Sequence, residues 1–133
     1  MEGAAEYAKN FVRERIDGGI PCFQYGIGAE DNNLVCTCAK CLAPLALPDG
    51  RVLTVEDDEE LFRSTQFLLW ISRIAEEIDR LRPGTRIETI AYMYASRPPA
   101  IALPKNVAVQ YAPIFKNMKQ DYFGGTNKKA KLY

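Results

Sequence analysis

Histidine is absent from this sequence of 133 residues. Its imidazole is the commonest metal ligand in proteins and the commonest general base near neutral pH. The absence therefore excludes a Ser-His-Asp or Cys-His mechanism that this chain carries alone.

The chain also has no excess of charge and no long apolar run. Lys and Arg total 17 and Asp and Glu total 17, so the formal net charge is 17 − 17 = 0. We therefore expect neither nucleic acid nor a membrane as a partner. No apolar run approaches the roughly 20 residues of a membrane-spanning helix. Because residues 1–6 lack the basic region and apolar core of a signal peptide, we expect no targeting signal in this chain.

Apolar periodicity predicts two amphipathic helices, one over residues 4–16 and one over residues 54–82. Gly18 and Gly19 follow the first helix, and Pro83-Gly84 ends the second. We expect Trp70 to lie in the core, beside the apolar stripe of the second helix.

Three apolar segments predict strands, at residues 20–28, 87–95 and 107–112. The middle strand is almost continuously apolar over residues 90–95, which is typical of a strand buried on both faces of a parallel sheet. The link over residues 96–106 contains three prolines and cannot form a regular helix. Either this crossover is irregular or the last two strands are antiparallel. The pattern predicts a single α/β domain over residues 1–133.

Residues 34–53 show no periodicity and predict a long loop, which contains three of the four cysteines. These are Cys36, Cys38 and Cys41. Their spacing brings the thiolates close enough to share one metal ion, and zinc takes four ligands in tetrahedral array. Cys22 is the candidate fourth ligand, with Glu30 and Asp31 as oxygen alternatives. Since a catalytic site needs an open position, we expect a structural zinc.

Disulfides and free thiols are the competing interpretations of the cysteines. A Cys36–Cys38 bridge would be strained, so the favoured full pairing is Cys38–Cys41 with Cys22–Cys36. Cys38 and Cys41 also match a redox C-x-x-C pair. The predicted loop position argues against this role, because such pairs begin a helix.

Three motifs carry a family resemblance. They are Asp31-x-x-x-x-Cys36-x-Cys38-x-x-Cys41, Ile90-Ala91-Tyr92 with Arg97-Pro98-Pro99, and Leu103-Pro104-Lys105-Asn106-Val107. In this order they resemble a domain-of-unknown-function family of bacterial proteins, mostly predicted to be secreted. That family looks like (β/α)8-barrel glycoside hydrolases related to α-glucuronidases. The resemblance covers nearly the whole chain.

The resemblance implies a partial (β/α)8 barrel with about three strands and flanking helices, cut from a larger secreted or periplasmic parent. A complete barrel takes at least about 200 residues. A partial barrel exposes sheet edges, through which we expect possible self-association. The implied partner is a polysaccharide or oligosaccharide, and we expect this piece to be inactive alone.

Candidate site residues follow from the position of barrel active sites at the C-terminal ends of strands. Asp31 matches the family's aspartate, so the resemblance implies that it binds sugar hydroxyls or is one of two catalytic carboxylates. Turn capping is the alternative role of Asp31. Tyr94, Arg97 and Tyr111 could line a carbohydrate cleft, against core packing for the tyrosines and a surface position for Arg97. Two other functions stay open: a non-catalytic carbohydrate-binding module and a zinc-stapled interaction domain.

Overall fold

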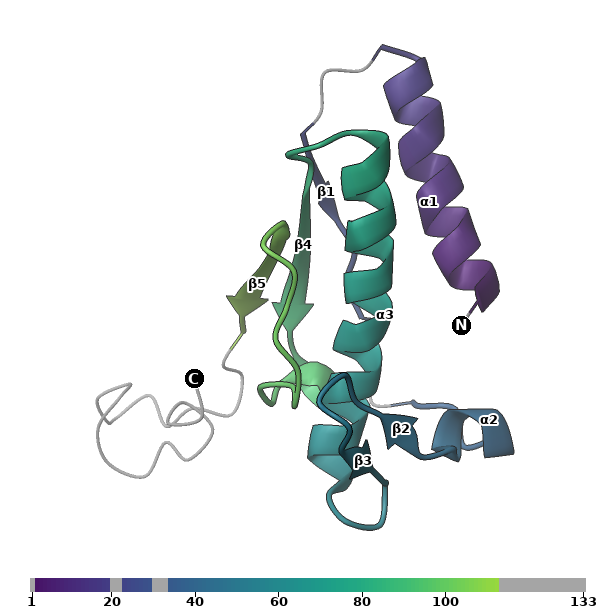
Figure 1. Cartoon of the computed structure of the whole chain (residues 1–133), viewed down its shortest axis with the longest axis vertical. Coiled ribbons are helices and arrows are strands. Elements are labelled where there is room, and N and C mark those ends of the chain that lie inside the picture. Colours follow the sequence, from purple (N-terminus) through teal and green to yellow (C-terminus); the bar gives the residue numbers. More distant parts are fainter. Residues whose placement is uncertain (1, 20–22, 30–33, 113–133) are drawn as a thin grey trace, which may run out of the picture.

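The fold is described by a computed structural model, which covers residues 2–19, 23–29 and 34–112. A three-stranded sheet has helices on one face, and a small ribbon and a short helix lie beside one end of it (Figure 1). The elements in chain order are α1 (Glu2–Asp17), β1 (Gln24–Gly26), α2 (Ala39–Leu42), β2 (Leu45–Ala46), β3 (Val52–Leu53), α3 (Glu59–Leu81), β4 (Arg86–Ala91), the 3-10 helix η1 (Met93–Ala95) and β5 (Val107–Tyr111).

The sheet has the strand order β1-β4-β5, and both strand pairs are parallel. This confirms the predicted α/β class and the three predicted strands. The link between β4 and β5 contains η1 and otherwise irregular chain, so the irregular crossover was the correct alternative and the antiparallel one was wrong. The middle strand is shorter than predicted. It ends at Ala91, and Met93, with φ of 48°, turns the chain into η1.

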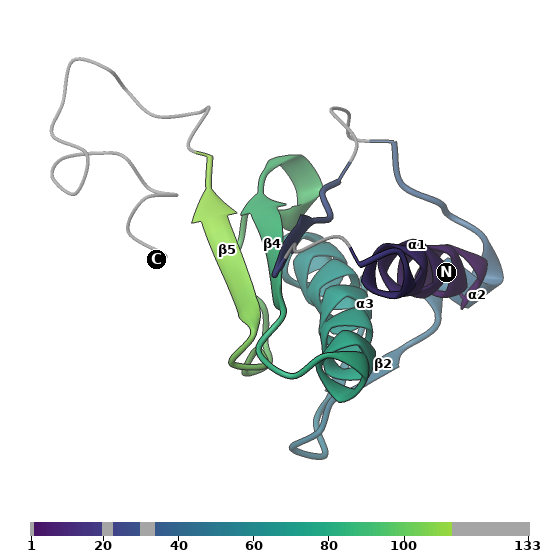
Figure 2. The same ribbon diagram turned by 90° about the horizontal axis from the view of Figure 1, so that it is seen from above.

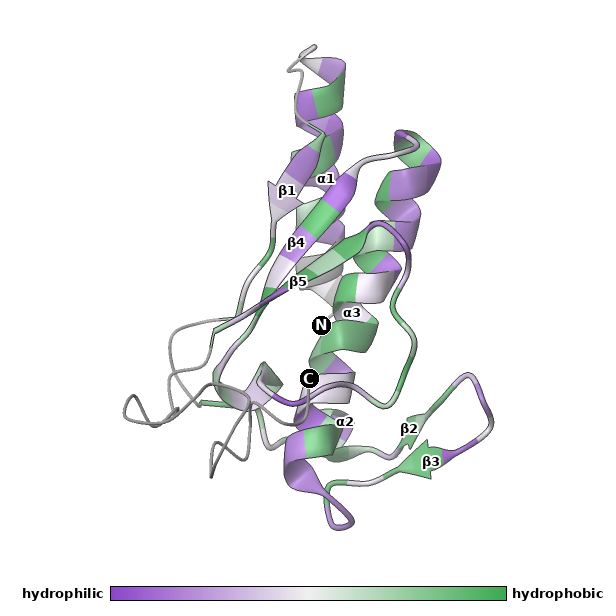
Figure 3. Ribbon diagram, turned by 90° about the vertical axis from the view of Figure 1, so that its left-hand side faces the viewer, coloured by the Kyte–Doolittle hydropathy of each residue, from purple (hydrophilic) through white to green (hydrophobic). Residues whose placement is uncertain are grey.

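The sheet is buried on one face. Ile87, Thr89 and Ala91 of β4 are at most 2% exposed, whereas Ile90, on the opposite face, is 42% exposed. Helix α3 packs against the buried face, and Figure 3 looks onto the other face of the sheet. Hydrophilic and hydrophobic residues alternate along the start of β4 in that view. The prediction that this strand is buried on both faces is therefore wrong, because Ile90 is exposed and the helices of the described residues cover the other face (Figure 2).

Helix α3 is the central element of the core. Its buried residues Leu68, Ile71, Ile74 and Ile78 follow the predicted stripe and pack with α1 and the sheet. The stripe differs from the prediction at its C-terminal end, where Leu81 in the last turn of α3 is 42% exposed.

The start of α3 also differs from the prediction. The helix begins at Glu59 rather than near Thr54, because Asp58 occupies the N-cap and accepts a hydrogen bond from the Leu61 N–H. Trp70 is half-buried and packs against the core, with its ring 5.9 Å from that of Phe67.

Residues 34–53 form more structure than the predicted long loop. They contain α2 and an antiparallel ribbon in which β2 pairs with β3. The ribbon turns at Pro48-Asp49-Gly50, where the Gly50 N–H donates to Leu47 O and Gly50 has φ of +85°. A positive φ is the conformation that glycine adopts at low cost, so this turn chemistry explains the ribbon.

Side chains of α3 fix the irregular link before β5. The buried Ser64 Oγ donates to Arg97 O, and Thr65 Oγ1 accepts from the Ala100 N–H at 2.9 Å. These bonds supply partners for backbone groups that no regular element satisfies. Within the described ranges, no helix is both long and apolar enough to cross a membrane.

Candidate metal centre

The cysteine cluster lies at the end of the sheet to which the parallel strands point. The strands end there, η1 follows β4 directly, and α3 begins at this same end (Figure 1). Loops after parallel strands meet at one edge, which is where α/β proteins place their sites.

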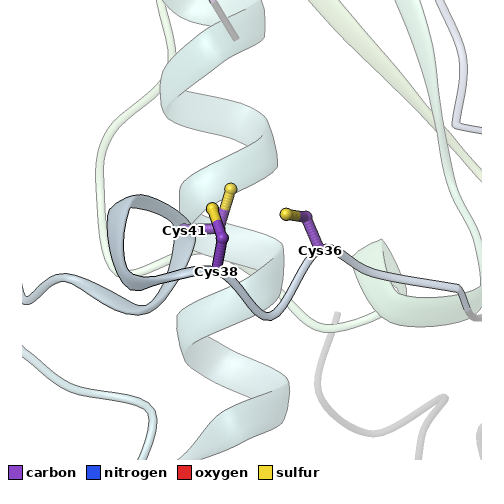
Figure 4. A group of neighbouring side chains, drawn as sticks. All are labelled: Cys36, Cys38 and Cys41. Atoms are coloured by element: carbon purple, nitrogen blue, oxygen red, sulfur yellow. The ribbon is translucent and has the colours of Figure 1, made fainter.

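Three sulfur atoms converge in this cluster. The Sγ atoms of Cys36, Cys38 and Cys41 all lie within 4.8 Å of one another. They turn toward one another beside α3 (Figure 4). All three are free thiols in the structure.

Local geometry explains the convergence. Cys38 is the N-cap of α2, and its carbonyl oxygen accepts from the N–H groups of Cys41 and Leu42 at 2.9 and 3.0 Å. This helical turn brings Cys38 and Cys41 to one side, since residues three apart share a helix face. The prediction that the C-x-x-C pair lies in a loop, away from a helix start, is therefore wrong.

Two side chains of α3 form hydrogen bonds with the backbone of the cysteine cluster. Arg63 donates to Cys36 O at 3.2 Å, and Gln66 donates to Cys41 O at 2.9 Å. Arg63 is only 5% exposed, and its Nε lies 3.6 Å from Glu59. These bonds to backbone carbonyl groups hold the cysteine segment against α3.

The thiols share hydrogen bonds, which separates their acidities. The backbone N–H of Cys41, together with the thiols of Cys36 and Cys41, lowers the pKa of the Cys38 thiol to about 7. Hydrogen bonds with Cys36 and Cys38, together with burial, raise the pKa of the Cys41 thiol to about 11. One thiolate therefore forms near neutral pH, and thiolate is the form that binds metal.

The donor set suits a soft divalent ion. Three thiolates are three of the four ligands of a structural zinc site, whose Zn–S distance is about 2.3 Å and whose tetrahedral geometry places sulfur atoms about 3.8 Å apart. The proposed fourth ligands, Cys22, Glu30 and Asp31, lie outside the described residues. The catalytic role expected for Asp31 likewise falls outside them.

A small pocket adjoins the cluster. Its volume is about 190 Å³, and its walls include Cys36, Cys41, Arg63 and Tyr94. Tyr94, in η1, packs edge-on against Phe67 with the ring centres 5.9 Å apart. The structure thus brings one of the three predicted sugar-binding residues to the cysteines.

The other two candidates lie elsewhere on the same edge. The Arg97 guanidinium pairs with the Asp58 carboxylate, the N-cap of α3, at 2.5 Å. Tyr111 is the last residue of β5 and is paired in register with Ala91. The arginine therefore has a structural partner.

Sequence reasoning missed the two anchors of the cluster, Arg63 and Gln66. Both follow the acidic start of a helix whose polar residues are normally solvated. No local signal distinguishes a buried arginine from an exposed one, because its burial depends on the cysteine loop folding over it.

Comparison with family models assigns the chain to a family. The model for the domain of unknown function DUF4838 matches residues 3–131. The chain belongs to the DUF4838 family. This bears out the predicted membership of a domain-of-unknown-function family over nearly the whole chain. No curated protein and no solved structure matches the chain. DUF4838 membership alone assigns no activity, so the site itself has to carry the functional argument.

Proposed function

We propose that the cysteine cluster binds one structural zinc ion, which fixes the loop at the carboxyl edge of the sheet. The observation that carries this proposal is the convergence of three sulfur atoms within 4.8 Å. Zinc would hold them about 3.8 Å apart, so each pair has to close by at most about 1 Å. Arg63 supports the site because its hydrogen bond to Cys36 O holds this part of the segment against α3.

Glu30 and Asp31, which follow β1 in the sequence, are the proposed sources of the fourth ligand. Cys22 is bonded to Phe23, whose backbone oxygen accepts from the Arg86 N–H at the amino end of the sheet, away from the cysteines, so we do not propose Cys22 as a ligand. A fourth protein ligand closes the coordination sphere, which makes the ion structural rather than catalytic. It would also tie the segment after β1 to the cysteines. A zinc ion in this place stabilises the fold, because the unfolded chain does not hold the four ligands together.

Metal analysis and melting test the zinc site. We expect one zinc per purified chain by mass spectrometry, and a lower melting temperature in chelator that added zinc restores. A Cys38→Ser/Cys41→Ser double variant should bind no zinc and melt like the chelated protein. Glu30→Gln or Asp31→Asn should weaken zinc binding if that carboxylate is the fourth ligand, and Cys22→Ser should leave it unchanged.

Two results would contradict the proposal. One is purified protein that contains no zinc, does not take it up, and melts at the same temperature in chelator. The other is a double variant that retains zinc. Unchanged zinc affinity in both Glu30→Gln and Asp31→Asn would instead remove only the proposed fourth ligand.

Carbohydrate binding at the same edge is the second candidate function. The sheet order β1-β4-β5 follows the chain order with all strands parallel and helices on one face. Consecutive strands of a (β/α)8 barrel are neighbours in this way, whereas a doubly wound sheet reverses its order. This supports the hypothesis that the chain is part of a barrel. That the parent is a secreted, glycoside hydrolase-like protein is proposed from the family resemblance alone.

The proposed roles follow from that edge. Tyr94 and Tyr111 would contact sugar faces, and Asp31, in the segment after β1, would bind hydroxyls or serve as one carboxylate. Arg97 forms an ion pair with Asp58. It would therefore either hold the chain at this edge in place or donate its remaining N–H groups to the sugar. A second carboxylate is required for hydrolysis, so we expect binding without turnover in this chain.

Calorimetric titration with an oligosaccharide panel tests this candidate. We expect measurable binding, no hydrolysis of aryl glycosides, and about tenfold weaker binding in Tyr94→Ala, equivalent to about 1.4 kcal/mol. Tyr7→Ala, an exposed tyrosine on α1, is the control and should bind normally. Absence of binding to every oligosaccharide, or equal loss in both variants, would contradict the proposal.

A further inference from the structure

A groove opens between α1 and the outer edge of β1. Its volume is about 610 Å³, and its walls include Tyr7 and Phe11 of α1, Tyr25 and Gly26 of β1, and Trp70 of α3. Helix α1 packs against α3 but lies beyond β1, on the side away from β4 (Figure 2). The groove shares no lining residue with the pocket beside the cysteines.

The outer edge of β1 is a strand edge that the rest of the described chain leaves uncovered. The inner edge bonds to β4, with the Ile27 N–H donating to Glu88 O and Phe23 O accepting from the Arg86 N–H. Because successive residues of a strand direct their backbone groups to opposite sides, Gly26 directs its N–H and C=O into the groove. Such an edge is a template for another strand.

The groove walls are unusually apolar for a free surface. Tyr7 is 73% exposed and Phe11 is 40% exposed. Neighbouring exposed aromatic side chains are typical of a surface that a partner covers.

The opposite edge of the sheet carries matching apolar residues. Val107 and Val109 of β5 face the helix side, in register with Ile87 and Thr89 of β4, and are only half-buried. In the described part of the chain, no strand pairs beyond β5. Each edge therefore leaves apolar side chains on the same face of the sheet.

We propose that the β1 edge of one copy of this chain pairs in parallel with the β5 edge of a second copy. The second copy's Val107 and Val109 would then lie beneath α1 of the first copy, against Phe11. Parallel addition keeps all strands in one direction and all helices on one face, as within each copy. This inference does not depend on the zinc site. It competes with the barrel hypothesis, in which the same two edges would pair with further strands of the parent.

Helix spacing argues against pairing between two β1 edges. Packed helices lie about 8–10 Å apart, whereas paired strands are only about 4.8 Å apart. A two-fold axis between two β1 strands would bring the second copy's α1 into the space of α3. At the β5 edge, no helix of the described residues lies beyond the strand, so α1 of another copy has room there.

The number of residues in the contact indicates how stable the pair is. Ten residues line the groove and five form β5, so a closed pair, which contains the contact twice, uses about 15 residues of each copy. A standard interface uses roughly 20–30 residues a side, and a specific one buries at least about 1,000 Å². With about 15 residues a side the contact is smaller than this standard, so the pair should dissociate on dilution.

Complementation between two variants tests the proposal. Light scattering over a concentration series should give association of the wild type that is lost in Phe11→Lys and in Val109→Lys. A mixture of the two variants should associate again, because one retains an intact groove and the other an intact β5 edge. Leu34→Lys changes an 88% exposed leucine outside the groove and should behave like the wild type.

Four outcomes would overturn it: a wild type that is monomeric at every concentration, association that Val109→Lys does not affect, a mixture that stays monomeric, or equal loss in Leu34→Lys. Circular dichroism checks that each variant folds. If Phe11→Lys does not fold, Tyr7→Lys replaces it. If Val109→Lys does not fold, Val109→Pro replaces it, since it removes the outward N–H of the strand edge but keeps an apolar side chain.

Discussion

Asp58 joins two parts of the chain through one carboxylate. Its Oδ1 accepts from the Leu61 N–H at 3.0 Å and caps α3, while its Oδ2 pairs with Arg97 at 2.5 Å. Both side chains are 31% exposed, so solvent screens the ion pair in part. The cap is therefore the larger part of its effect on stability.

Replacing Asp58 should destabilise the fold. We expect Asp58→Ala to lower the free energy of unfolding by about 1–3 kcal/mol, because the helix loses its cap and Arg97 loses its partner. Denaturant titration measures the loss. The control is Glu56→Ala, an exposed acid two residues earlier, which should change stability by less than about 0.5 kcal/mol. Equal effects in the two variants would contradict the assigned roles.

Cys38 should be the most reactive of the described thiols when metal is removed. Hydrogen bonds lower its pKa to about 7, and the pKa of Cys41 is raised to about 11. Because only the thiolate is nucleophilic, alkylation of Cys38 should increase as the pH rises through about 7 and level off above it.

Mass spectrometry after timed alkylation of chelated protein measures this profile. Cys41 is the internal control and should remain slow up to about pH 9. Denatured protein should show one common midpoint near the ordinary thiol pKa. A Cys38 midpoint that is the same in folded and denatured protein would contradict the hydrogen-bond assignment.

Among the elements, the start of β5 is linked to α3 and β4 by one side chain. The Asn106 Nδ2 donates to Ala75 O at 2.8 Å and to Thr85 O at 3.2 Å, and the Asn106 backbone oxygen accepts from the Ile87 N–H. This amide positions a strand that follows an irregular crossover, where no helix sets the register.

Loss of this amide should be costly. Asn106→Ala should lower the free energy of unfolding by about 1–3 kcal/mol, since two partly buried carbonyl groups lose a donor. Thermal and denaturant unfolding measure it. The neighbouring Lys105→Ala changes an exposed side chain and is the control. A loss below about 0.5 kcal/mol in Asn106→Ala would show that water replaces the amide.

Periodicity predicted the long elements well and the short ones poorly. Helices α1 and α3 and the three parallel strands lie where the apolar patterns placed them. Helix α2 and the ribbon of β2 and β3 were missed, because two- to four-residue elements are too short for a period. The Pro48-Asp49-Gly50 turn was the signal that indicates the ribbon.

At the scale of the whole molecule, helices cover one face of the sheet, and the described residues leave the other face exposed to solvent. Ile87 is fully buried against the helices, whereas Ile90 is 42% exposed on the other face. An apolar pattern alone does not distinguish the two residues, which are both isoleucines of β4.

This asymmetry predicts different costs of truncation. Ile87→Ala should lower the free energy of unfolding by about 2–5 kcal/mol, because it leaves a cavity in the core. Ile90→Ala should lower it by less than about 1 kcal/mol, since the side chain is already partly in water. Denaturant titration of both variants makes the comparison. Similar large losses would mean that something covers the open face in solution.

The sequence predicted which residues form the candidate site but not the residues of α3 that hold it in place. The spacing of Cys36, Cys38 and Cys41 predicted that their thiols converge, and they do. The buried Arg63 and Gln66 that hold this loop are 25 or more residues away in sequence, so no local pattern pairs them with the cysteines.

The sequence by itself determined the α/β class, the two long helices, the positions of the three strands and the cysteine cluster. Each of these depends on side-chain periodicity or spacing within one segment, which is local information. Only the tertiary structure decided that one face of the sheet stays open, that Arg97 pairs with Asp58, and that a groove lies beside β1. These features arise from the packing of distant segments, and burial and pairing between such segments are set by the fold as a whole.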